Sequence, residues 1–166
     1  MTRSDIAIRE IATSDGPALR ALWRETWTAT YGPSLGTEAL AAMLGQLDAA
    51  DPATMLPAAD ERGLCALLGG GIVGSVIFAE RNRTACLWGL YVQPSRQRRG
   101  IGTLLLEAAA ARLETSDRME VRVLESSSGA VAFYRKHGFS ISHQETDAAA
   151  IPATATVMTR ALGPRH

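Results

Sequence analysis

The sequence predicts an α/β (α+β) fold in which a mixed, mostly antiparallel sheet of about seven strands is flanked by four helices. Three runs of apolar and β-branched residues follow one another across the short turn sequences Gly69–Gly71 and Arg81–Arg83, which is typical of antiparallel hairpins. A helical pattern over Ile101–Leu113 comes next, and a crossover of that length makes the following strand parallel to its neighbour. The predicted order is β-α-α-β-β-β-α-β-α-β-β.

The first half of the chain contains the pattern of one strand and two helices. Ser14 or Asp15 can cap the first helix, and Pro17 is tolerated in its first turn. The Gly-Pro pair within Tyr31–Ser34 is expected to break this helix. The expected elements are a strand over Ile6–Ile11, a helix ending near Tyr31, a helix from Thr37 to Leu47 and a loop over Asp51–Arg62.

The second half alternates strands with helices. Arg135, Lys136 and His137 followed by Gly138 have the composition of a basic last helical turn and its C-terminal glycine. The expected elements are strands over Leu64–Leu68, Ile72–Glu80 and Thr84–Val92, the helix over Ile101–Leu113, a strand over Val121–Leu124, a helix capped within Ser126–Ser128, and strands over Phe139–Ser142 and Ala155–Arg160.

The composition favours one globular domain over residues 1–166, with a core spanning about 4–162, because a chain of 166 residues can bury a single core. The formal net charge is zero, so no global charge draws the protein to nucleic acid or to an acidic membrane. The N-terminus lacks the apolar stretch of a signal peptide, and no apolar run reaches the length of a membrane span. We therefore expect a cytoplasmic protein with no nucleic-acid or membrane partner.

The segment Gln97–Thr103 follows a strand and opens a helix. Gly100 and Gly102 let the backbone approach a ligand closely, and the free N–H groups of the helix N-terminus favour an anion the size of a pyrophosphate. No Gly-Lys-Ser/Thr closes a Walker loop, and three glycines at dinucleotide-binding spacing are missing. The remaining alternatives are a plain strand-to-helix turn with a solvated charge run, or a nucleic-acid patch, which the neutral net charge disfavours.

Two motifs carry a resemblance to a known family. One is Gln97-Arg-Arg-Gly-Ile-Gly102, and the other is Ala130-Val-Ala-Phe-Tyr-Arg-Lys-His-Gly-Phe139. Together with the order of elements, which covers nearly the whole chain, they make the sequence similar to the GNAT superfamily of acyl-CoA-dependent N-acyltransferases. The resemblance implies a GNAT-like domain that uses acetyl-CoA as co-substrate and needs no metal.

The resemblance also implies where coenzyme A binds. Backbone N–H groups of the loop would hold the pyrophosphate, and the main chain of Leu90 and Val92 would bond the pantetheine, with a bulge that aims one N–H at the thioester carbonyl. Ser127 stands where the family often has Asn, so its contact with pantetheine is in question. The implied cofactor-binding residues are Leu90, Val92, Gln97, Arg98, Arg99, Gly100, Ile101, Gly102, Thr103, Ser127, Phe133 and Tyr134.

The chemistry of amine acetylation requires a proton acceptor for the amine and a stabilised leaving thiolate. Tyr134 matches the tyrosine of the family's Phe-Tyr pair, and its phenol could act as general acid to the thiolate. Glu25, Glu80 and Glu125 are candidates for the base, although a solvated surface carboxylate is the more usual role of such residues. The histidines are scattered and the two cysteines isolated, so no spacing indicates a metal site or a covalent nucleophile.

The resemblance implies that the acceptor is a primary amine on a small molecule or a peptide. Trp27 and Tyr31 share one side of the first helix with Trp23, and Trp88 would face the same side of its strand as Leu90 if that strand is regular. These aromatic residues could line the acceptor pocket or simply pack in the core. A catalytically silent acyl-CoA-binding sensor or scaffold is the alternative to an enzyme, and exposed edge strands would allow a homodimer.

Overall fold

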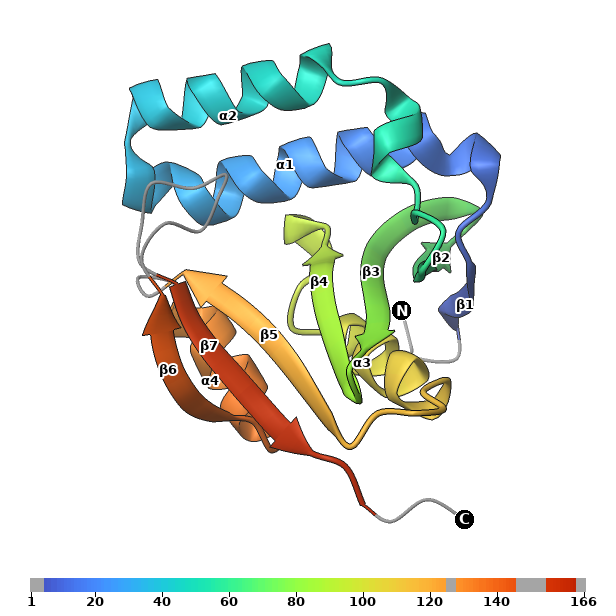
Figure 1. The fold of residues 1–166 in the computed structure, drawn as a ribbon. Helices are drawn as coiled ribbons and strands as arrows, with labels where there is room; N and C mark the ends of the chain where they lie inside the picture. Colours follow the sequence, from blue (N-terminus) through green and yellow to red (C-terminus); the bar gives the residue numbers. More distant parts are fainter. Residues whose placement is uncertain (1–4, 125–127, 146–154, 164–166) are drawn as a thin grey trace. The chain divides into compact units, whose positions relative to one another are not determined.

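The computed structural model describes residues 5–124, 128–145 and 155–163. Its strands form one seven-stranded sheet in the order β1-β2-β3-β4-β5-β7-β6, and its elements follow the predicted order (Figure 1). The predicted fold class is therefore confirmed. The chain separates into two compact units, one made of Met1–Phe78 and Gly89–Arg112 and the other of Ala79–Trp88 and Leu113–His166.

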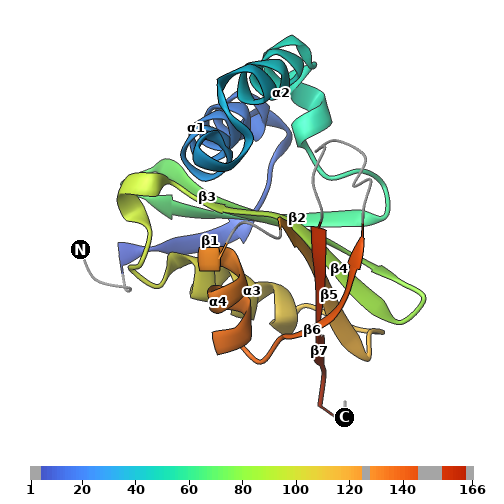
Figure 2. The same cartoon turned by 90° about the vertical axis from the view of Figure 1, so that its left-hand side faces the viewer.

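The first unit contains three helices and the N-terminal strands. Helices α1 and α2 lie side by side on one face of β1–β3, and α3 lies on the opposite face (Figure 2). A core cluster of Leu19, Leu47 and Met55 holds the two helices together, with Trp23 and Trp27 packed against it. The elements are β1 (Ala7–Glu10), α1 (Gly16–Leu35), α2 (Thr37–Ala49), β2 (Glu61–Leu68), β3 (Gly71–Arg81), β4 (Thr84–Val92) and α3 (Ile101–Ala111). β3 belongs to this unit only as far as Phe78, and β4 only from Gly89 onward.

The second unit contains the C-terminal strands and one helix. β4 pairs with β5 in parallel from Thr84–Arg118 to Leu87–Val121, as a helical crossover requires. β7 pairs antiparallel with both β5 and β6. The side chains of Met119, Val121 and Val123 are buried, so alternate residues of β5 form part of this unit's core. The remaining elements are β5 (Arg118–Leu124), α4 (Ser128–Lys136), β6 (Ser140–Glu145) and β7 (Ala155–Ala161).

Two tight turns connect β2 to β3 and β3 to β4. Gly69 and Gly70 both have positive φ, and so do Asn82 and Arg83. A two-residue turn with both φ values positive matches the twist of an antiparallel hairpin, so these local conformations impose the predicted antiparallel order.

The prediction that Tyr31–Ser34 breaks the first helix was wrong. α1 continues to Leu35, with Pro33 in its last turn, and ends where Gly36 takes a φ of 83° and its N–H bonds the Gly32 carbonyl at 3.3 Å. Proline removes one backbone donor from the last turn, and the helix ends two residues later at Leu35. The helix therefore ends about one turn later than the Gly-Pro pair led us to expect.

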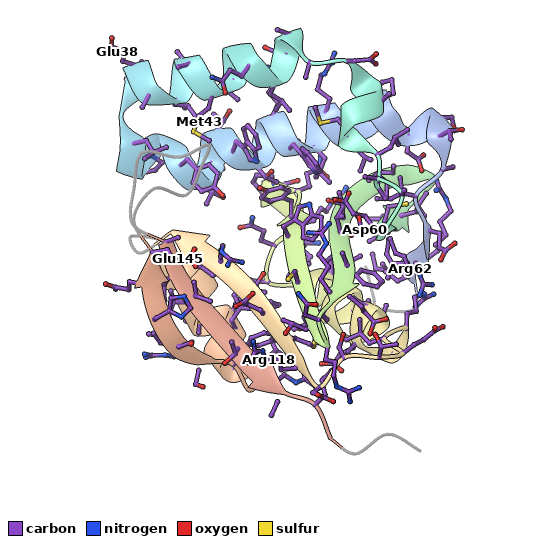
Figure 3. All side chains as sticks on the ribbon, in the orientation of Figure 1. Glu38, Met43, Asp60, Arg62, Arg118 and Glu145 are labelled. Atoms are coloured by element: carbon purple, nitrogen blue, oxygen red, sulfur yellow. The ribbon has the colours of Figure 1, made fainter. Side chains whose placement is uncertain are left out.

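Two strand starts also differ from the prediction. β2 begins at Glu61 and β5 at Arg118, each three residues earlier than the apolar runs suggest. Arg62 lies at the start of β2, where its guanidinium donates to Glu10 at 3.0 Å and stacks over Phe78 at 5.6 Å (Figure 3). Arg118 bonds Thr84 on the paired strand. Polar residues with cross-strand partners thus extend strands that hydrophobicity alone marks as shorter. Within the described residues, no helix has the length and hydrophobicity that a membrane span requires.

Candidate active site

The loop from β4 to α3 is shaped by its own residues. After a short 3₁₀ turn over Pro94–Arg96, Arg98 adopts a φ of 64° and Gly100 a φ of 83°, and α3 begins at Ile101. The Gln97 side-chain amide donates to the Val92 carbonyl at 3.1 Å, which ties the loop to the end of β4. The N-cap residue Gly100 makes no side-chain capping bond to α3, and the positive dipole end of the helix favours an anion at this place.

Gly74 on β3 lets this loop and helix come close to the sheet. A Cβ at Gly74 would lie 3.1 Å from the Tyr91 carbonyl oxygen, 2.9 Å from Leu105 Cδ1 and 3.3 Å from Ile101 Cγ2. These atoms belong to β4 and to the first turns of α3. The absence of a side chain at position 74 therefore sets the depth at which α3 packs, and with it the position of the helix N-terminus.

β4 departs from regular strand geometry at Gly89, where φ is 60°. The expectation that Trp88 and Leu90 face the same side depended on a regular strand, and that premise does not hold. Ser75 Oγ donates to the Gly89 carbonyl at 2.8 Å and accepts from the Trp23 indole N–H at 3.3 Å. The Arg81 guanidinium lies over the Trp88 ring, with its Cζ 5.6 Å from the ring centroid.

The aromatic residues of α1 form a continuous row. The rings of Trp23 and Trp27 stack with centroids 6.4 Å apart and an interplanar angle of 18°. The centroids of the Trp27 and Tyr31 rings are also 6.4 Å apart, with the two rings tilted. Tyr91 from β4 meets Trp23 edge-on at 5.9 Å. Burial raises the pKa of the Tyr31 hydroxyl, while its hydrogen bond with Tyr91 acts in the opposite direction. The predicted sharing of one helix side is thus observed, and β4 extends the row.

The three base candidates have different surroundings. Glu25 is exposed on α1 and accepts a hydrogen bond from the Gln93 amide at 3.3 Å. Glu125 lies outside the described residues, as does the cofactor candidate Ser127.

Glu80 anchors the segment between α3 and β5. Its carboxylate accepts from the backbone N–H groups of Glu114, Thr115 and Ser116 at 2.9–3.1 Å, and from the Ser116 hydroxyl at 2.8 Å. Burial alone would raise the pKa of Glu80, but these donors outweigh burial and lower it. A carboxylate with a lowered pKa and occupied lone pairs is a poor proton acceptor, so the geometry argues against Glu80 as base.

Tyr134 is buried in the aromatic cluster at the end of α4. Its ring meets Phe133 and Phe139 edge-on, each with centroids 5.2 Å apart. Phe133 also contacts His137 at 4.6 Å. The backbone N–H of Phe139 donates to the Tyr134 carbonyl at 3.0 Å, and this hydrogen bond joins the end of α4 to the residue that precedes β6. The Phe-Tyr pair therefore has a packing role whatever its part in chemistry.

Glu120 is a carboxylate that the sequence analysis did not single out. It alternates with the buried Val121 on β5, its side chain is only 16% exposed, and it accepts from the Cys86 thiol at 3.8 Å and from Arg122 at 3.5 Å. Arg122 also bonds Glu145 at the end of β6 (Figure 3). In the sequence, Glu120 could have been found as a charged residue at one of the polar positions that alternate with apolar positions along β5. Among the described side chains, no group of three or more His, Cys, Asp or Glu could hold a metal ion.

The comparisons with known proteins agree with this arrangement. The sequence profile described as the acetyltransferase (GNAT) family matches residues 17–139, which is well over half of the chain. The chain therefore belongs to the GNAT acetyltransferase family. No curated protein matches the sequence significantly.

Solved structures with the same fold are distant in sequence. The PaiA N-acetyltransferase from Thermoplasma acidophilum, solved with coenzyme A, is 21% identical, with a TM-score of 0.73 and coverage of 95% of this chain and 99% of that chain. The ribosomal-protein-S18-alanine N-acetyltransferase from Escherichia coli is 18% identical (TM-score 0.71; 97% and 96% covered). An aminoglycoside 6'-acetyltransferase type Ii is 20% identical (TM-score 0.67; 96% and 99% covered). At these identities the likeness establishes the fold alone.

Proposed function

We propose that this protein is an acetyl-CoA-dependent N-acetyltransferase that transfers the acetyl group to a primary amine by direct attack in a ternary complex. The observation that carries the proposal is the loop before α3, with Arg98 and Gly100 at positive φ and an uncapped helix N-terminus. Membership of the acetyltransferase (GNAT) family supports it. Residues 1–166 would act as one catalytic domain.

Coenzyme A would be held mainly by backbone groups. Backbone N–H groups within the loop Gln97–Thr103 would bind the pyrophosphate, although that of Gln97 itself donates to the Pro94 carbonyl at 3.4 Å. The exposed guanidinium groups of Arg98 and Arg99 would add positive charge. Leu90 and Val92 would offer main-chain hydrogen bonds to the pantetheine arm. The PaiA enzyme solved with coenzyme A has the same fold, which supports this placement.

The chemical step would combine backbone and side-chain groups. The Leu90 N–H would polarise the thioester carbonyl, and the Tyr134 phenol would donate a proton to the departing thiolate. Among the described carboxylates, we retain Glu25 as a candidate proton acceptor for the amine and add Glu120. The pH dependence of kcat/KM in Glu25→Gln and Glu120→Gln would identify the base, because only its loss removes the acidic limb of the profile.

The acceptor would meet an aromatic surface. Trp27 and Tyr31 are half-buried on the row that Tyr91 extends, and such rings can stack on an apolar amine or on its cation. Two of the neighbours named above are, by name, acetyltransferases of a ribosomal-protein alanine and of aminoglycosides, so the fold alone does not select the acceptor. Small-molecule and peptide amines are both compatible with the proposal.

A catalytically silent acyl-CoA-binding module is the second candidate, because the loop would support binding with or without transfer. Release of free coenzyme A thiol from acetyl-CoA across a panel of polyamines, amino acids, aromatic amines and peptides with free N-termini tests the choice. We expect acceptor-dependent thiol release with at least one class. Tight binding of acetyl-CoA with no such release by any amine would leave the silent module, and failure to bind acetyl-CoA would overturn both.

A further inference from the structure

Three residues from three elements form a hydrogen-bonded relay within the first unit. Trp23 on α1 donates its indole N–H to Ser75 Oγ on β3 at 3.3 Å, and Ser75 Oγ donates to the Gly89 carbonyl on β4 at 2.8 Å. Ser75 is fully buried, so water does not compete for its hydroxyl. We call Trp23, Ser75 and the Gly89 carbonyl the β4 relay.

The relay has a fixed direction. A serine hydroxyl carries one proton, and here one of its lone pairs receives the indole N–H, so the proton is directed at the Gly89 carbonyl. Hydrogen bonds in series polarise one another and strengthen the chain. The indole is itself held in place, because it stacks on Trp27 and meets Tyr91 edge-on. The position of the Gly89 carbonyl is therefore set by α1 and β3.

Gly89 is the residue of β4 that most needs such support. Its φ of 60° lies outside strand geometry, and glycine has the widest conformational freedom of any residue. A Cβ there would lie 3.5 Å from Trp23 Cζ2, so the ring packs closely against the backbone that the relay holds. The pairs between β4 and β5 end at Leu87, two residues before Gly89.

The carbonyl of Gly89 and the N–H of Leu90 belong to one planar trans peptide, so they point in opposite directions. Fixing the carbonyl toward Ser75 fixes the Leu90 N–H away from β3. We infer that Trp23 and Ser75 are positioning residues that aim the Leu90 N–H at the thioester carbonyl of acetyl-CoA. This inference rests on the proposed acetyl transfer.

The competing explanation is that the relay only joins α1, β3 and β4. The two explanations differ in what the loss of the hydroxyl changes. A positioning role affects the transition state, in which negative charge develops on the thioester oxygen, so it lowers kcat and leaves acetyl-CoA affinity nearly unchanged. A purely structural role lowers the melting temperature without a specific effect on kcat.

Ser75→Ala tests the relay, with Ser116→Ala as a matched control. Ser116 is also buried and also donates a 2.8 Å hydrogen bond, but to Glu80 in the second unit. We expect Ser75→Ala to lower kcat by about tenfold and to change the Kd for acetyl-CoA by less than about twofold. Ser75→Thr, which keeps the hydroxyl, should recover most of kcat. Trp23→Phe should give a smaller loss, because Ser75 can still bond Gly89. Ser116→Ala should keep wild-type kcat.

Isotope-edited infrared spectroscopy of acetyl-CoA carrying a carbonyl-labelled acetyl group reports the polarisation directly. The bound carbonyl stretch should lie at lower frequency than that of free acetyl-CoA in the wild-type protein, and closer to the free value in Ser75→Ala. A wild-type protein that neither binds nor transfers acetyl would overturn the proposed function itself. Normal wild-type turnover, with the same kcat and carbonyl frequency in Ser75→Ala as in Ser116→Ala, would overturn the relay alone.

Discussion

Two segments of the first unit present backbone N–H groups, and they are built in opposite ways. The loop Gln97–Thr103 takes its shape from its own residues, chiefly Arg98 and Gly100 at positive φ. The peptide between Gly89 and Leu90 is held from outside, by Ser75 on another strand and by Trp23, which lies 52 residues before Ser75. A locally encoded segment tolerates change elsewhere in the chain, whereas a remotely supported one depends on the packing of distant elements.

The largest effect is expected from a change inside the locally encoded loop. Gly100→Val places a β-branched residue at a φ of 83°, a conformation such residues almost never adopt. The loop must then rearrange, and we expect the Kd for acetyl-CoA, measured by calorimetry, to rise by more than about tenfold. Gly45→Val on α2 is the control, since a Cβ there meets no atom within 4 Å. Wild-type affinity in Gly100→Val would show that the loop conformation does not matter for binding.

Tyr134→Phe tests whether acetyl transfer needs a side-chain hydroxyl in addition to the backbone N–H groups of the two segments. The aromatic packing against Phe133 and Phe139 is retained, and only the hydroxyl is lost. We expect kcat to fall by about tenfold or more, with little change in acetyl-CoA affinity. Steady-state kinetics with a saturating acceptor makes the measurement. Unchanged turnover would leave Tyr134 with a packing role only.

Gly74→Ala tests the packing that both segments share. The added methyl group would lie 3.1 Å from the Tyr91 carbonyl and within 3.3 Å of two α3 side chains, and the backbone carbonyl cannot yield easily. We expect the free energy of unfolding to fall by about 1–3 kcal/mol in urea denaturation. Gly71→Ala at the start of the same strand is the control, because its nearest neighbour is 3.8 Å away. Equal stability of the two variants would contradict the close packing.

Glu80→Gln probes a carboxylate outside both segments and should affect stability without affecting binding. The lowered pKa of Glu80 means that its carboxylate stabilises the fold above the ordinary glutamate pKa of about 4.3, and that this contribution is lost as the pH falls through the folded pKa. We expect a loss of about 1–2 kcal/mol at neutral pH and a flatter stability profile in acid. Glu61→Gln is the control, because it makes the same change at a carboxylate that accepts a 2.8 Å hydrogen bond from the Ala58 backbone N–H. A wild-type acid profile in Glu80→Gln would refute the assignment.

The sequence was most informative where structure is set locally. The short turn sequences, the glycine loop and the helical crossover predicted the order of elements and the direction of β5 correctly. The predicted end of α1 was too early, because the helix continues past Pro33 to Leu35. The predicted starts of β2 and β5 were too late, because polar residues such as Arg62 and Arg118 extend these strands through partners on other elements. Such partners cannot be read from hydrophobic patterns.

The candidate site divides along the same line. The sequence alone determined the fold family and the loop before α3, since both depend on short motifs whose own residues lie close together in the chain. Only the tertiary structure showed that Glu80 is bound by the Glu114–Ser116 backbone, that Glu120 is mostly buried beside Cys86, and that Gly89 is supported by Ser75 and Trp23. A hydrogen bond between residues distant in sequence forms only when the chain has packed. A local sequence pattern therefore does not identify which distant residue a polar side chain will bond.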